Sequence, residues 1–126
     1  MARAPVPDAW LARVGAVLDP LPDVRRERAW TGTRWVVRGH TVAHLFGGED
    51  GLLRITFRAP MEEVAAFEHL GDPYFRIGRT GDAVGLVLDH PEAGPVDGQE
   101  LAELLTESYC VQAPQELVAR VERPGP

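Results

Sequence analysis

The chain has 126 residues, 44% of them apolar and 25% charged, which is the usual balance of a globular protein. This length predicts one domain over residues 1–126, with a core from about residue 8 to 121 and flexible ends. The single cysteine excludes an internal disulfide, and the apolar runs are too short for a membrane span or a secretion signal. We therefore expect a cytoplasmic protein that has no membrane partner.

The first predicted element is a helix over residues 8–18, which Asp8 can cap. Its apolar side chains recur at helical spacing, at Trp10, Leu11, Val14 and Leu18. Pro20 and Pro22 end this helix. The mostly polar residues 23–30 leave their own conformation open.

The hydrophobic period then changes to that of β-structure. Residues 33–38 and 41–46 are rich in strand-forming side chains, and Gly39-His40 between them favours a tight turn. Residues 52–58 alternate apolar and polar side chains, after a glycine-rich turn over 47–51. These three segments predict an antiparallel meander.

The second half of the chain mixes helical and strand patterns. The expected elements are a helix over 60–71, strands over 74–78 and 83–88, a helix from Asp97 or Gly98, and a short last helix over 114–121. Short turns between neighbouring strands favour an antiparallel sheet over a parallel one. We therefore predict an α+β fold of order α-β-β-β-α-β-β-α-α, with about five strands and the helices packed on one face.

The sequence shows no motif for catalysis or for a bound cofactor. His40 and His44 have no third ligand at a suitable spacing for zinc. The segment 108–110 holds possible nucleophiles, but no base is visible for them, and core packing at a helix end explains them. The glycines of segment 47–51 join two strands instead of leading into a phosphate-binding helix. We therefore expect neither an enzyme, nor a metal site, nor a cofactor.

Charge is distributed unevenly along the chain. All thirteen basic residues are arginines, and the net charge is −6. Residues 25–58 carry a net charge of +4, and residues 59–126 carry −9. A basic first half followed by acidic helices predicts two different surfaces on one domain.

The basic half suggests a nucleic-acid-binding face. Alternation would place Arg34 with Arg38, and Arg54 with Arg58, on one side of the predicted sheet. Trp30 and Trp35 lie nearby and could stack on a base or a flat ligand. A solvated face whose arginines pair with the acidic helices, or with Glu49 and Asp50, would give the same pattern. The candidate binding residues are Arg34, Trp35, Arg38, Arg54 and Arg58.

Several stretches resemble the MmcQ/YjbR-like family of small bacterial proteins, from about Trp10 to Val121. They are the segments 21–24, 32–39, 57–60, 85–89 and 100–109, together with Ala113-Pro114. The helix that ends in Ser108-Tyr109 and precedes a short last helix is the most specific of these features. The resemblance implies a small α+β domain, often called double-wing, whose antiparallel sheet is backed by helices. The family is commonly labelled DNA-binding, on the basis of fold similarity.

Together these observations predict a small non-enzymatic binding protein that binds DNA or another nucleic acid, weakly and with sensitivity to salt, through an arginine-bearing sheet face. Two alternatives stay open. One is a protein-interaction or chaperone-like adaptor whose acidic helices contact a partner, and the other is a small-molecule-binding accessory protein. The sequence does not specify the oligomeric state.

Overall fold

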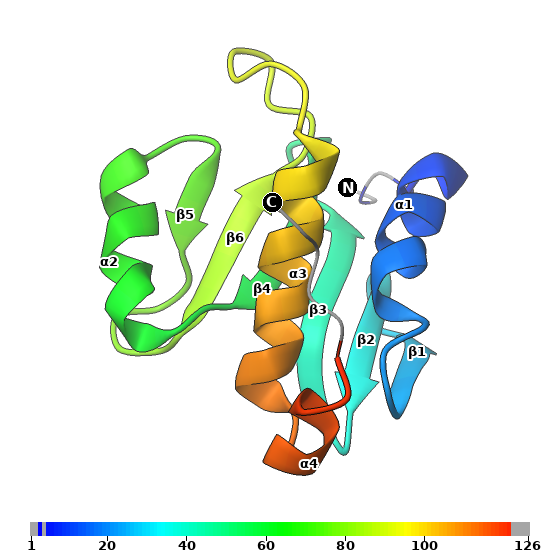
Figure 1. Cartoon of the computed structure of the whole chain (residues 1–126). Coiled ribbons are helices and arrows are strands. Elements are labelled where there is room, and N and C mark those ends of the chain that lie inside the picture. Colours follow the sequence, from blue (N-terminus) through cyan, green and yellow to red (C-terminus); the bar gives the residue numbers. More distant parts are fainter. Residues whose placement is uncertain (1–2, 4, 122–126) are drawn as a thin grey trace.

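The computed structural model describes residues 3 and 5–121, and Figure 1 shows its architecture. Over these residues the chain forms four helices and one six-stranded antiparallel sheet, so the predicted α+β class is confirmed. The flexible ends predicted at residues 1, 2, 4 and 122–126 lie outside the described residues.

The helices are α1 (Asp8–Leu18), α2 (Met61–Leu70), α3 (Gly98–Gln112) and α4 (Gln115–Val118). The strands are β1 (Val24–Arg28), β2 (Thr33–Val37), β3 (His40–Gly47), β4 (Leu53–Arg58), β5 (Tyr74–Arg76) and β6 (Ala83–Val87). They lie in the order β1-β2-β3-β4-β6-β5, and every neighbouring pair is antiparallel. Helix α3 crosses β3 and β4, α1 lies beside it, and α2 packs on β5 and β6 (Figure 1).

The structure adds one strand to the predicted five. Residues 24–28 form β1, which pairs in register with β2 from Val24↔Val37 to Arg28↔Thr33. Three arginines and a glutamate occupy four of its five positions, so the strand shows no apolar alternation. Because β1 lies at the sheet edge and is largely exposed, its position does not require that alternation.

Two local predictions were wrong. The turn between β2 and β3 is formed by Arg38 and Gly39, both with positive φ (49° and 84°), so His40 already belongs to β3. At the start of α1, Pro7 is the cap residue, and no side chain caps the helix. By contrast, Asp97 caps α3 as expected, and its carboxylate accepts hydrogen bonds from the amides of Gln99 and Glu100.

The core lies between the sheet and the helices. β4 directs every second side chain toward α3, and these are Leu53, Ile55 and Phe57, all buried. The helices contribute buried side chains such as Leu18 of α1 and Leu105 of α3. The remaining side chains of β4 therefore point to the opposite face, which no helix of the described chain covers.

The last turns of α3 attach this helix to the sheet through polar side chains. Ser108 is fully buried, and its hydroxyl accepts from the Arg58 amide (2.8 Å) and donates to the Val42 carbonyl (2.6 Å). The Tyr109 hydroxyl donates to the Pro22 carbonyl (2.7 Å), and the Gln112 amide donates to the Thr41 carbonyl (2.8 Å). These bonds fix α3 across the two central strands.

Removing the Ser108 hydroxyl should therefore destabilise the fold. In Ser108→Ala the Arg58 amide and the Val42 carbonyl both lose their partner, which should cost about 1–3 kcal/mol. Urea unfolding followed by circular dichroism measures the change. The control is Thr106→Val, since the Thr106 hydroxyl donates only to the Ala102 carbonyl of its own helix. Equal stabilities for the two variants would contradict this role of Ser108.

Candidate functional site

The uncovered face of the sheet is the candidate functional surface. Because paired residues share a face, the register places Arg34, His44, Thr56, Gly85 and Phe75 in one row across five strands. The next row pairs Phe46 with Arg54 and Val87. Two of the predicted arginines, Arg34 and Arg54, thus lie on this face. Arg58 lies on it as well, two residues beyond Thr56 on β4.

Aromatic rings and guanidinium groups alternate along one side of this face. Trp30, in the turn after β1, is 85% exposed, and the guanidinium of Arg3 lies 5.4 Å from its ring centroid. The same guanidinium lies 5.9 Å from the ring of Phe46, which is paired with Arg54. Arg54 in turn lies 6.0 Å from the ring of Phe75. We call these five residues the aromatic–arginine row.

A hollow of about 390 Å³ opens on the uncovered face beside this row. Phe46, Phe75 and Ile77 supply much of its apolar lining, and His44, Arg54 and Arg58 supply polar groups. The His44 ring stacks at 4.7 Å on Phe46, and its Nε2 lies 2.6 Å from the Thr31 carbonyl oxygen. The hollow thus combines flat apolar surface with cationic groups.

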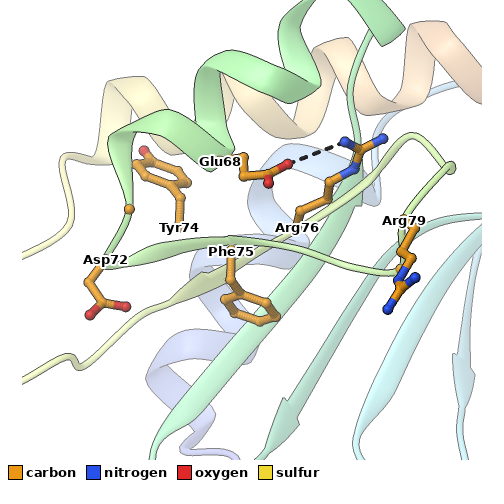
Figure 2. Close-up of a pocket in the computed structure, with 8 residues that line it drawn as sticks. Glu68, Asp72, Tyr74, Phe75, Arg76 and Arg79 are labelled. Atoms are coloured by element: carbon orange, nitrogen blue, oxygen red, sulfur yellow. Dashed lines mark hydrogen bonds and ion pairs between the residues drawn. The ribbon is translucent and has the colours of Figure 1, made fainter.

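Phe75 reaches the uncovered face because of two local features. Side chains alternate along β5, so Tyr74 and Arg76 point toward α2 and Phe75 points away from it (Figure 2). On the neighbouring strand the paired residue is Gly85, and a Cβ atom there would collide with the Phe75 ring. The missing side chain of Gly85 is therefore what allows the Phe75 ring to lie over the sheet at this position.

The three candidate arginines of the uncovered face are all held by carboxylates. Arg34 pairs with Glu27 at 2.9 Å, and Arg58 pairs with Asp82 at 2.7 Å. Asp50 receives two hydrogen bonds from Arg54, at 2.6 and 2.7 Å. These bonds, with one from the Leu52 amide, hold the pKa of Asp50 well below its usual value, and they raise the pKa of Arg54.

The alternative of arginines paired with Glu49 and Asp50 is thus confirmed for one of the candidate arginines. Arg54 pairs with Asp50, whereas Glu49 lies 3.6 Å from Arg3. These pairs hold the guanidinium groups in place but cancel most of their charge. The surface is therefore much less basic than the arginine count suggests.

Two of the predicted binding residues lie elsewhere. Trp35 is 0% exposed, because alternation along β2 directs it to the helix side, where its indole donates to Asp19 at 2.8 Å. Its predicted stacking on a base is therefore wrong for this fold. Arg38 lies in the turn after β2 and donates to Asp23 at 2.7 Å, which raises its pKa. Arg38 has positive φ in this turn, so it does not continue the strand alternation that would have aligned it with Arg34.

The sequence reasoning missed Arg3, Phe46 and Phe75. Phe46 lies two residues after His44 on β3, so strand alternation alone could have placed it on the uncovered face. Phe75 depends on Gly85, ten residues away, and Arg3 depends on contacts with Trp30 and Phe46. These contacts join residues that lie far apart in the sequence, so no local sequence pattern predicts them.

A second hollow, of about 550 Å³, lies at β5 and the loop that follows it (Figure 2). Its charged residues include Glu68 and Arg76, which pair with each other at 3.2 Å. Arg79 also lines it, but its side chain points away from Arg76 in Figure 2. These groups do not converge on one ligand, so we do not assign a site here.

Comparison with known proteins adds no assignment: no protein-family model and no curated protein sequence matches the chain. Within residues 3 and 5–121, no cluster of three histidine, cysteine or acidic side chains could hold a metal ion. None of the helices in this part of the chain has the length and apolar character that crossing a membrane requires. The candidate site therefore depends on its own geometry.

Adding a methyl group at Gly85 should displace the Phe75 ring. We expect Gly85→Ala to lower the free energy of unfolding by about 1–3 kcal/mol, because the ring has to move off the sheet. Gly81→Ala is the matched control, since a Cβ there meets almost nothing. Urea unfolding gives the stabilities, and aromatic NMR shifts report the ring position. An unmoved Phe75 signal in Gly85→Ala would contradict this account.

Proposed function

We propose that the protein is a small non-enzymatic, cytoplasmic binding protein whose uncovered sheet face binds single-stranded nucleic acid. The observation that carries the proposal is the aromatic–arginine row. Unpaired bases stack on exposed aromatic rings, and guanidinium groups bind phosphates and also stack. The rings of Trp30, Phe46 and Phe75, separated by Arg3 and Arg54, offer both kinds of contact along one line.

The proposal keeps three of the candidate arginines and replaces the stacking residue. Arg34, Arg54 and Arg58 supply phosphate contacts, and Phe46 and Phe75 take the role first given to Trp35. Because each of these arginines already has a carboxylate partner and the chain carries −6 overall, we expect weak binding. About three phosphate contacts correspond to a slope of roughly −2 in log affinity against log salt.

Membership of the MmcQ/YjbR-like family forms part of the same proposal. The stretch that carries the most specific resemblance, 100–109, forms most of α3, and its Ser108 and Tyr109 attach the helix to the sheet. Because these residues fix the helix to the sheet, the resemblance supports a shared fold. It says nothing by itself about ligand, so the nucleic-acid proposal depends on the uncovered face.

One observation favours a second candidate function. The hollow on this face is mainly apolar and has Arg54 and Arg58 in its lining, which suits a single flat anionic molecule as well as one base of a longer strand. The two functions differ in length dependence. A strand gains affinity with each added nucleotide up to the size of the face, whereas a small-molecule site binds a mononucleotide as well as the strand.

Fluorescence anisotropy with a labelled oligothymidine strand tests the proposal. We expect binding at low salt that weakens at physiological salt, and weaker binding to a duplex of the same length. Phe46→Ala and Arg54→Ala should each reduce affinity about tenfold, because each removes a stacking or phosphate contact. Arg120→Ala is the control, since this exposed arginine follows α4, which packs on α3 on the helix side of the sheet. Absence of binding at low salt would sink the proposal.

A variant that removes a negative charge should raise the affinity for the strand, whereas the two preceding variants lower it. Asp50→Asn removes the carboxylate that neutralises Arg54 and should raise affinity for the strand several-fold, with a steeper salt dependence. The same anisotropy titration measures it. A lower or unchanged affinity would show that Arg54 does not meet phosphate.

A further inference from the structure

The edge strand β1 has backbone groups that no other strand of the described chain uses. β1 lies at one end of the sheet and pairs only with β2. The Ala29 amide donates to the Gly32 carbonyl at 3.1 Å, so these two residues form a hydrogen-bonded pair. In an antiparallel ladder, hydrogen-bonded pairs alternate with pairs whose backbone groups point away from the partner strand. Arg25 and Glu27 therefore direct their backbone groups to β2, while Arg26 and Arg28 direct theirs away from the sheet. β1 thus presents an open hydrogen-bonding edge.

The same edge carries two arginines without a carboxylate partner. The other arginines on strands of the described chain are each in an ion pair, and they are Arg26, Arg34, Arg54, Arg58 and Arg76. Arg25 and Arg28 of β1 are exposed, and no ion pair joins them to the described residues. Because they are three residues apart on one strand, they project to opposite faces of the sheet, so β1 offers one unpaired guanidinium on each face of its edge.

A hollow of about 540 Å³ opens next to this edge. Its lining includes Val36, Arg25 and Arg38. The carboxylates of Glu27 and Asp23 also line it, and they pair with Arg34 and Arg38. A strand added to β1 would extend over this hollow, because its side chains project to the two faces of the sheet. The edge therefore combines backbone groups, positive charge and an apolar contact.

We propose that β1 binds an extended acidic segment of a partner protein, which adds to the sheet as a seventh strand. The backbone of the segment would pair with the outward groups of Arg26 and Arg28, and its carboxylates would meet Arg25 and Arg28. A second copy of the chain fits less well, because β1 carries three arginines against one glutamate, so two such strands repel each other. This interaction uses the outer edge of β1, two strands away from β3, which carries the Phe46 ring of the uncovered face.

The probe is a fluorescein-labelled peptide of paired glutamates and paired valines, so that carboxylates project to both faces of the added strand. It is used in a plain form and in a form N-methylated at every residue. The two forms have the same charge, but the methylated one cannot donate backbone hydrogen bonds along either edge. We expect the plain peptide to bind and the methylated peptide to bind at least about tenfold more weakly. The double variant Arg25→Glu, Arg28→Glu should lose binding to a similar extent, while Arg120→Glu and Phe46→Ala should keep it.

Two further results would overturn the proposal. Equal affinity for the plain and methylated peptides would show that charge alone attracts them, and this comparison uses only the wild-type protein. A dimer in sedimentation analysis that Arg28→Pro dissociates would show that a second copy occupies the edge. Proline is tolerated at this position because the Arg28 amide makes no ladder bond. Failure of the plain peptide to bind at millimolar concentration would also refute the idea.

Discussion

The attachment of α3 to the two central strands is the constraint on which both proposed binding surfaces depend. The Ser108 hydroxyl stands between the Arg58 amide on β4 and the Val42 carbonyl on β3, where no solvent can replace it. Together with the hydrogen bond from the Gln112 side chain to the Thr41 carbonyl, this hydroxyl fixes α3 against one face of the sheet. Strand alternation then sends Arg54 and its neighbours to the other face. The buried hydrogen bonds of Ser108 therefore determine which face of the sheet stays open and which side chains a ligand can reach.

The sequence predicted the fold class and most elements, and it failed where long-range contacts decide. The alternation of β4 placed Arg54 and Arg58 on the solvent side, as the structure confirms. β1 was missed because an exposed edge strand needs no apolar side chains. Trp35 was misassigned because closeness to Arg34 along the chain was taken for closeness in space, although neighbours on a strand point to opposite faces. The Phe75 ring lies over Gly85 of the neighbouring strand, and the pattern of a single strand cannot predict such a contact.

Charge segregation gives the domain two chemically different sides. The segment from β1 to β4 holds seven of the thirteen arginines, and α2, α3 and the loop between β6 and α3 hold many of the acids. On the uncovered face, carboxylates from turns and a neighbouring strand pair with Arg34, Arg54 and Arg58. These pairs hold the guanidinium groups in fixed positions and neutralise most of their charge. At the β1 edge this compensation stops with Arg25 and Arg28. The face therefore suits ligands that combine stacking with a few phosphates, and the edge suits a carboxylate-bearing strand.

The central claim, that the uncovered sheet face is the binding surface, is tested most directly by NMR. Backbone amide and aromatic shifts of the labelled protein would be followed during titration with oligothymidine at low salt. The account predicts perturbations that centre on β3, β4 and β5, with the Phe46 and Phe75 rings most affected. Perturbations confined to α2 and α3, or none at saturating strand concentration, would contradict it.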